Sequence, residues 1–153
     1  MAELAESLAK HHRYLDRLFA SALEAADKSD WAAFTGELSA LGGALDLHID
    51  FEEDELFLAF EQASGLHDGP TRVMRIEHAQ MRDLLHALSA AQPRVDPEGC
   101  RAELEHLRTI LQMHNVKEET VFYPVCERLL GARDDLLAGA RALNEWMPPA
   151  TPP

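Results

Sequence analysis

The feature that most constrains this sequence is a histidine–glutamate pattern that occurs twice. Residues 48–57 are HIDFEEDELF and residues 114–123 are HNVKEETVFY, so in both segments a histidine precedes a pair of glutamates by four positions. The offset between the two copies is 114 − 48 = 66. Four residues along a helix give a rise of ~6 Å and a rotation of ~40° beyond one turn. The histidine and the first glutamate of each copy therefore share one helix face.

The same offset extends beyond the two motifs. It pairs His12 with His78, upstream of the motifs, and it pairs Asp30 with Asp96, where helices are expected to begin. Leucines at helical spacing are paired in the same way: Leu18 with Leu84, Leu38 with Leu104, Leu41 with Leu107 and Leu45 with Leu111. The chain therefore resembles two copies of one helical hairpin, each with a histidine on its first helix and His-x-x-x-Glu on its second.

Apolar residues recur at helical spacing through the whole chain, and leucine, alanine and glutamate are its most frequent residues. We expect helices over residues ~2–27, ~31–62, ~71–91 and ~97–130, the last bent or interrupted near Pro124, and a short fifth helix over ~133–146. Four main helices joined by short loops predict an all-α fold, an antiparallel four-helix bundle. The bundle domain is expected to cover residues 1–147, with a flexible proline-rich tail over 148–153.

Charge and composition exclude several partners. The net charge is −13, from 27 acidic and 14 basic residues, which argues against nucleic acid and anionic membranes. No apolar run approaches the ~20 residues of a membrane span, and the N-terminus lacks the apolar stretch of a signal peptide. Cys100 and Cys126 form no C-x-x-C pattern and are expected to be free thiols. We therefore expect a cytoplasmic protein, as a monomer or a homodimer.

The two histidine–glutamate faces also carry apolar residues such as Leu41 and Leu45, so they are expected to point into the bundle. Burying imidazoles and carboxylates is costly unless their charges are compensated. Two divalent cations would compensate them. The predicted metal ligands are His12, His48, Glu52, His78, His114 and Glu118. In this arrangement the first two histidines bind one ion, the last two bind the other, and both glutamates bridge. Ligation by nitrogen and oxygen alone favours iron, then manganese or zinc.

On the segments HHRYLDRLF, HIDFEEDELF, EHAQMRDLL and HNVKEETVFYP the sequence resembles the hemerythrin family, in its branch of hemerythrin-like (HHE) cation-binding domains. The resemblance implies a four-helix bundle with a non-heme di-iron centre, oxo- or hydroxo-bridged, held at the six positions above. Oxygen-carrying hemerythrins have a further histidine one turn before the position of His78, where this chain has Met74. This departure argues against simple oxygen carriage and favours reaction with oxygen, peroxide or nitric oxide.

Neighbouring residues leave alternatives open. His11 competes with His12, although the offset and Leu15 favour His12. Glu55 is either an extra ligand or a carboxylate at the bundle end. Tyr123 is either a packing partner of Phe57 or a redox-active tyrosine beside the metal.

Other residues near the motifs are expected to be peripheral. Glu53 and Glu119 are predicted to be solvated or to support a ligand, and the alternative is that either one replaces the glutamate before it as the ligand. Asp16 and Arg82, which the repeat also makes equivalent, would form an ion pair, orient a ligand histidine or lie on the surface. Three histidines are placed outside the site: His67, His86 and His106. Three methionines are placed in the core, Met74, Met81 and Met113, and two tryptophans are expected to pack near helix ends, Trp31 and Trp146.

Three functions compete. The first is a di-iron protein that reacts with or binds a small oxidant, including peroxidase, catalase-like or nitric-oxide-reacting activity. The second is an oxygen- or iron-sensing or iron-binding module without turnover, and the third is a metal-free structural bundle. A ferritin-like site is disfavoured because it needs Glu-x-x-His on two helices. Here Glu103-x-x-His106 has Glu37-x-x-Ala40 as its repeat equivalent.

Overall fold

The structure is a computed structural model that describes residues 3–146. The predicted tail at residues 148–153 lies outside the described part of the chain. The helical elements, in chain order, are α1 Glu3–Asp27, α2 Trp31–Phe51, η1 Glu52–Leu56, α3 Phe57–Ser64, α4 Pro70–Ala90, α5 Pro97–Lys117, η2 Glu118–Phe122, α6 Tyr123–Leu130 and α7 Asp134–Glu145. Here η1 and η2 are π-helical segments.

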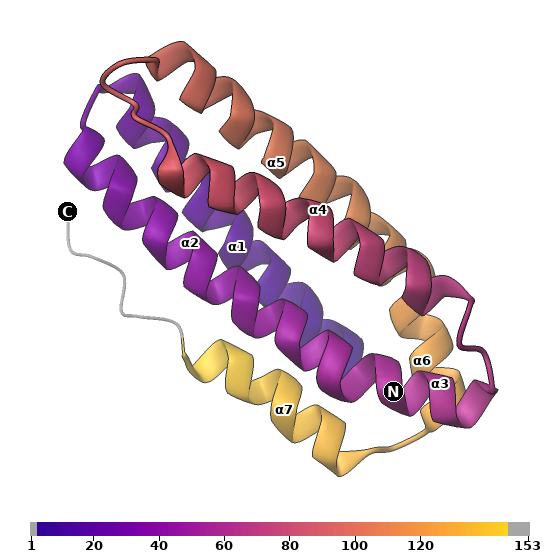
Figure 1. Cartoon of the computed structure of the whole chain (residues 1–153). Helices are drawn as coiled ribbons and strands as arrows, with labels where there is room; N and C mark the ends of the chain where they lie inside the picture. The colour runs from indigo at the N-terminus through magenta and orange to yellow at the C-terminus, as the bar shows by residue number, and fades with distance from the viewer. Residues whose placement is uncertain (1–2, 147–153) are drawn as a thin grey trace.

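Four long helical rods form an antiparallel bundle, as predicted (Figure 1). α1 and α2 pack as one hairpin and α4 and α5 as the other, while α1 contacts α5 and α2 contacts α4. The backbone stays in the right-handed helical region through η1 into α3 and through η2 into α6. The second and fourth rods are therefore continuous, with a single π turn inserted in each.

The internal repeat governs the backbone as well as the side chains. The repeat offset relates the start of α2 at Trp31 to the start of α5 at Pro97, and it relates the start of η1 to the start of η2. Equivalent aspartates cap α2 and α5: Asp30 accepts from the Ala33 N–H at 3.1 Å and Asp96 from the Gly99 N–H at 2.9 Å. Both rods also end on glycines with positive φ, Gly65 at 73° and Gly131 at 64°.

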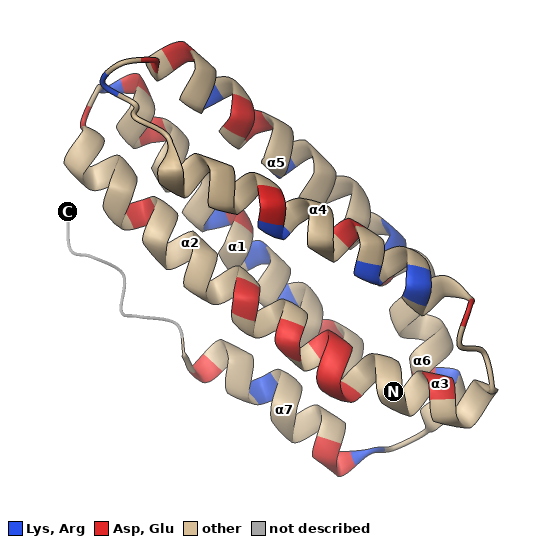
Figure 2. Ribbon diagram, viewed as in Figure 1, with Lys and Arg blue, Asp and Glu red and all other residues tan. Residues whose placement is uncertain are grey.

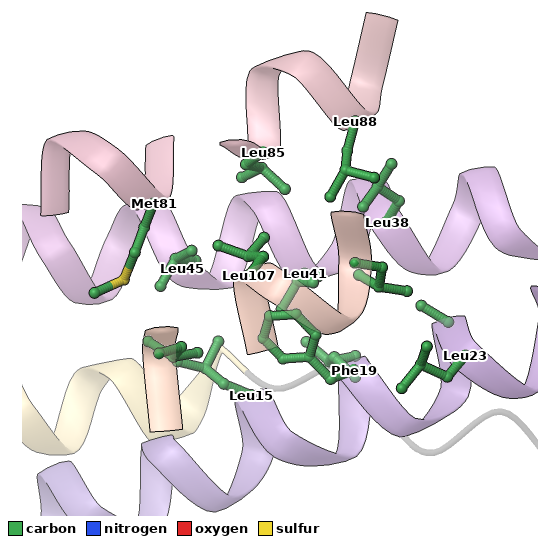
Figure 3. Close-up of a cluster of buried hydrophobic side chains, with 14 of the residues drawn as sticks. Leu15, Phe19, Leu23, Leu38, Leu41, Leu45, Met81, Leu85, Leu88 and Leu107 are labelled. Atoms are coloured by element: carbon green, nitrogen blue, oxygen red, sulfur yellow. The ribbon is translucent and has the colours of Figure 1, made fainter. Parts of the chain in front are cut away.

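Two hydrophobic clusters fill the bundle, one on each side of a polar layer. The larger, which we call the turn-side cluster, draws on residues 14–25, 34–49, 81–88 and 100–111. Figure 3 shows part of it, with Leu15 and Phe19 of α1 directed toward side chains of α2 and α4. The smaller, the α7-side cluster, contains Leu8, residues 51–60, Met74, residues 122–126 and residues 136–143. The layer between them holds the repeated polar pattern, a histidine on each long rod.

The surface is rich in charge, and acidic residues recur along α2 and η1 (Figure 2). Two packing expectations are wrong: Met113 is 66% exposed, and Trp146 is 76% exposed. Met74 and Met81 are buried as predicted. Among the described residues, none of the helices has both the length and the apolar character needed to cross a membrane.

α7 lies along α1 and α2 and closes the α7-side cluster (Figure 1). It lies close to α2 at Gly139, where an added Cβ would stand 2.5 Å from Cε2 of Phe51. We expect Gly139→Ala to lower the free energy of unfolding by about 1–3 kcal/mol, because α7 or the buried ring must move. Urea unfolding measures the change.

The matched control is Gly36→Ala, at an exposed helical position with nothing within 4 Å of the added Cβ. It is expected to stabilise the chain by up to ~1 kcal/mol through helix propensity. A neutral or stabilising Gly139→Ala would show that α7 does not pack against Phe51 as described.

Candidate metal centre

The polar layer brings together the six side chains that the sequence singled out. His12 comes from α1, His48 and Glu52 from the second rod, His78 from α4, and His114 and Glu118 from the fourth rod. Their ligand atoms form two groups, one with His12 and His48 and one with His78 and His114, and both groups include Glu52 and Glu118. All six residues are at most 3% exposed. That they bind metal stays a prediction, but the required convergence is present.

The spacing of the imidazoles suits one cation per pair. The Nε2 atoms of His12 and His48 lie 3.1 Å apart, and those of His78 and His114 lie 3.0 Å apart. Two ligands on neighbouring positions of an ion with metal–nitrogen bonds of ~2.1 Å have about this separation. Four nitrogens from four helices thus face inward in two matched pairs.

The two carboxylates lie between these pairs. Glu52 places Oε1 3.3 Å from Nε2 of His48 and Oε2 3.1 Å from Nε2 of His78. Glu118 places Oε1 3.4 Å from Nε2 of His12 and 3.2 Å from Nε2 of His114. Each carboxylate therefore contacts one imidazole of each pair, as a bridging ligand would.

Three of the four carboxylate oxygens in this layer have no hydrogen bond within the part of the chain that the structure describes. Oε2 of Glu52 and both carboxylate oxygens of Glu118 are fully buried without a hydrogen-bond partner among the described residues. Buried polar atoms are normally paired because leaving them unpaired costs ~1–3 kcal/mol, and more for a charge. Cations between the imidazoles would satisfy these oxygens, so the donor set fits a metal centre.

The electrostatics of the layer also favour positive charge. Burial alone would lower the pKa of His12, but the carboxylates of Glu118 and Glu119 outweigh it and raise that pKa from 6.5 to about 9. Burial is likewise overcome at His114, whose pKa is raised by Glu118. Burial would raise the pKa of Glu52, yet the adjacent imidazoles lower it well below 4.5. Without metal, protons bound to the histidines supply part of the positive charge that a cation would supply.

A second set of polar groups contacts the outer nitrogens of the imidazoles. Nδ1 of His78 lies 2.9 Å from Glu53, and Nδ1 of His114 lies 3.2 Å from Glu77. A carboxylate next to Nδ1 accepts its hydrogen and leaves the lone pair of a neutral imidazole on Nε2, which faces the layer. This is the tautomer that metal binding needs. Glu53 therefore contacts a predicted ligand histidine, while its side chain is 25% exposed.

Tyr123 lies inside the site, beside the predicted ligands, rather than only packing against an aromatic residue. Its hydroxyl donates to Oε1 of Glu52 and lies 3.2 Å from Nε2 of His12 and 3.4 Å from Nε2 of His48. Burial, with the charges of Glu118 and Glu52, raises the pKa of Tyr123 well above 10, so the hydroxyl keeps its proton.

The π turns explain this placement. In η2 the Tyr123 N–H donates to the Glu118 carbonyl, a step of five positions, and in η1 the Phe57 N–H does the same to Glu52. The extra residue in the turn brings the fifth residue after each glutamate onto the site face, where an α-helix would put the fourth. Phe57 accordingly stacks on His78, with centroids 5.6 Å apart, as Tyr123 does on His12 at 5.7 Å.

Other residues considered from the sequence lie outside the site. Glu55 is exposed and is absent from both ligand groups. Arg82 does not pair with Asp16; it donates to Asp46 at 3.1 Å and to Asp50 on α2. Three histidines are exposed, as expected: His67, His86 and His106.

His11 enters the sequence argument only as a competitor of His12, and the structure gives it a different place. It is buried, 1% exposed, and its Nδ1 lies 2.9 Å from Nδ1 of His48. Burial, reinforced by His48 and His12, lowers the pKa of His11 to about 3. Its position beside His12 in the sequence could not reveal this contact, because the sequence does not define the rotation of α1 relative to α2.

The family model of the hemerythrin HHE cation-binding domain matches residues 3–126 of this chain, which includes all six side chains of the layer. The chain belongs to this family. The HHE domain binds metal cations, typically iron, so this member has both the family's fold and buried histidine–glutamate groups able to hold a metal. Neither the curated proteins nor the solved structures contain a significant match to the chain.

Proposed function

We propose that this HHE domain is a non-heme di-iron protein that reacts with a small oxidant: oxygen, peroxide or nitric oxide. His12 and His48 would hold one ion and His78 and His114 the other, with the carboxylates of Glu52 and Glu118 within reach of both. Iron bound there supplies the exchange of electrons with the oxidant. Two histidines and carboxylates per ion are the ligand set of iron sites that keep positions open for a small molecule.

The observation that carries this proposal is the buried Met74 beside a site with two imidazoles per ion. Met74 lies one turn before His78, is 5% exposed, and belongs to the α7-side cluster. Because residue 74 is a methionine packed among apolar side chains, it adds no third imidazole next to His78. Each end of the site therefore has two imidazoles. The residues of the layer are almost fully buried, so a substrate must be small.

The surrounding residues have separate tasks in this function. Glu53 and Glu77 orient imidazoles by accepting from Nδ1. The two apolar clusters limit the access of bulk water from both sides of the layer. Tyr123 brings a protonated hydroxyl to the end that contains His12 and His48. There it can give a proton to the small molecule once that molecule has taken up electrons.

The proposal is tested with chain produced in iron-supplemented medium. We expect two iron ions per chain and a ligand-to-metal absorption band that disappears on reduction. Stopped-flow mixing of the reduced protein with oxygen, peroxide and nitric oxide, with metal-free chain as the control, identifies the reactant. A folded chain that stays empty would refute the proposal, and stable binding without turnover would instead favour a sensing or iron-binding module.

The role of Tyr123 gives a separate prediction. We expect Tyr123→Phe to keep its metal content and to consume the oxidant ~10²–10⁴-fold more slowly, because a proton donor is lost. The fold should tolerate the change, since Phe57 occupies the equivalent place in the first half. Stopped-flow rates and metal analysis measure both effects.

Tyr14→Phe is the matched control, because Tyr14 belongs to the turn-side cluster and its ring lies against His11, which is not one of the six predicted ligands. An unaltered rate in Tyr123→Phe would assign Tyr123 to packing alone.

A further inference from the structure

The site has near-twofold symmetry, and the partners of the four outer imidazole nitrogens show where this symmetry is broken. The repeat offset relates Glu53, which contacts His78, to Glu119, which lies 3.7 Å from Nδ1 of His12. It also relates Glu77, the partner of His114, to position 11, since 77 − 66 = 11. Position 11 is occupied by histidine.

His11 therefore takes the place of a carboxylate. Its Nδ1 lies 2.9 Å from Nδ1 of His48, and the two rings stack with centroids 5.0 Å apart and planes 6° apart. His11 thus brings a buried imidazole to Nδ1 of His48, and this ring has no carboxylate charge to offer there. Three of the four inner histidines are adjacent to a carboxylate, and the fourth is adjacent to a second imidazole.

This difference acts on the metal positions through the basicity of the imidazoles. A carboxylate that accepts from Nδ1–H makes Nε2 a stronger ligand, and losing such a partner typically costs ~10–100-fold in metal affinity. The end with His78 and His114 has two close carboxylates, Glu53 at 2.9 Å and Glu77 at 3.2 Å. The end with His12 and His48 has the more distant Glu119, whose side chain is 37% exposed.

Positive groups around Glu53 and Glu77 do not cancel the difference in carboxylate charge between the two ends of the site. Lys117 binds Glu77 from the solvent side with its side chain 48% exposed, and Arg82 lies 3.9 Å from Glu53 with its side chain 35% exposed. Both carboxylates still contact imidazole nitrogens of the site. Exposed partners weaken their charge only partly, because solvent screens an exposed cation.

We propose that the two metal positions have unequal affinities, that the position of His78 and His114 binds the first cation, and that His11 in place of a carboxylate sets the difference. This inference rests on the proposed di-metal site. It makes His11 and Glu77 positioning residues, which act through His48 and His114 respectively. The second ion, beside Tyr123, is then the exchangeable one.

The test loads metal-free chain with Co²⁺, a divalent probe whose absorption reports coordination. Titration should show two steps that differ by at least ~10-fold in affinity. Crystals grown with one equivalent of Co²⁺ should show anomalous density mainly between His78 and His114. Full loading with two equivalents shows that both positions exist.

Two variants assign the cause. Glu77→Gln keeps the shape of the side chain and removes its charge, so the ratio of the two affinities should fall ~10-fold or more. Asp83→Asn, an exposed acid on the same helix, is the matched control and should leave the ratio unchanged. His11→Glu should strengthen the position of His12 and His48. If the His11→Glu variant does not fold, the crystals grown with one equivalent of Co²⁺ and the Glu77→Gln variant still test the inference.

Two ions with equal occupancy at one equivalent, or an unchanged ratio in Glu77→Gln, would overturn the inference and leave the di-metal site intact. A wild-type chain that binds no Co²⁺ and no iron would overturn the proposed function, and the inference with it. Preferential filling at His12 and His48 would contradict the role given to His11.

Discussion

Replacing Glu118 with glutamine is expected to abolish most of the stabilisation that metal gives to the fold. Oε1 of Glu118 lies 3.4 Å from Nε2 of His12 and 3.2 Å from Nε2 of His114, so this one carboxylate is within reach of both predicted metal positions. Glutamine has nearly the same shape but is neutral, and it cannot compensate two cations in a buried layer. A metal present at about 1,000 times its Kd stabilises a chain by ~4 kcal/mol, and we expect roughly this increment to vanish.

The measurement compares urea unfolding with and without metal under anaerobic conditions, so that effects on the metal-free chain cancel. Glu55→Gln is the matched control, since it makes the same substitution at an exposed glutamate of the other π turn. It should keep the full increment. A Glu118→Gln chain that is stabilised by metal as strongly as the wild type would remove Glu118 from the ligand set.

The sequence predicts most of the fold because the repeat constrains it twice. One hairpin of amphipathic helices leaves the partner helices undefined, but two equivalent hairpins pack with matching faces inward. The helix-start prediction at Asp30 and Asp96 is confirmed by the side-chain caps. The family and the four-helix bundle are confirmed as well, the first by the match over residues 3–126.

The π turns limit what the sequence can show about the site. A regular α-helical period of ~3.6 residues per turn through residues 118–123 rotates Tyr123 away from Glu118. One inserted residue restores the alignment. No residue pattern in the segment EETVFYP indicates the inserted residue. The proline does not explain it either, because the first half has a π turn with Leu58 where the second half has Pro124. The fourth rod is not interrupted near Pro124, and the π turn that precedes this residue has another cause than the proline itself.

Contacts between helices are the other limit. Sequence spacing fixes which residues of one helix share a face, but it does not fix the rotation of that helix against its neighbour. His11 and Glu77 both flank a predicted ligand, and only the packing of α1 on α2 and of α4 on α5 brings them to His48 and His114. Met113 illustrates the same limit in reverse, because a methionine next to His114 proves to face solvent.

Removing an imidazole should have a different effect from removing a bridging carboxylate. We expect His114→Ala to bind at most one ion per chain and to unfold ~3–5 kcal/mol more easily than the metal-loaded wild type, because its loss leaves the buried charge of Glu118 with one partner fewer. His114 is 1% exposed, and its Nε2 lies 3.2 Å from that carboxylate. The truncation also leaves a cavity where the ring had packed. Metal analysis and urea unfolding of the loaded chain measure the two effects.

His106→Ala is the control on the same helix, because His106 is exposed and lies outside both ligand groups. It should keep two ions and its unfolding midpoint. In a two-ion site His114→Ala keeps the position of His12 and His48, whereas Glu118→Gln weakens both positions together. The same loss in both variants would indicate a single ion shared by all six side chains. A His114→Ala chain with two ions and unchanged unfolding would show that the imidazoles of this layer are packing residues rather than ligands.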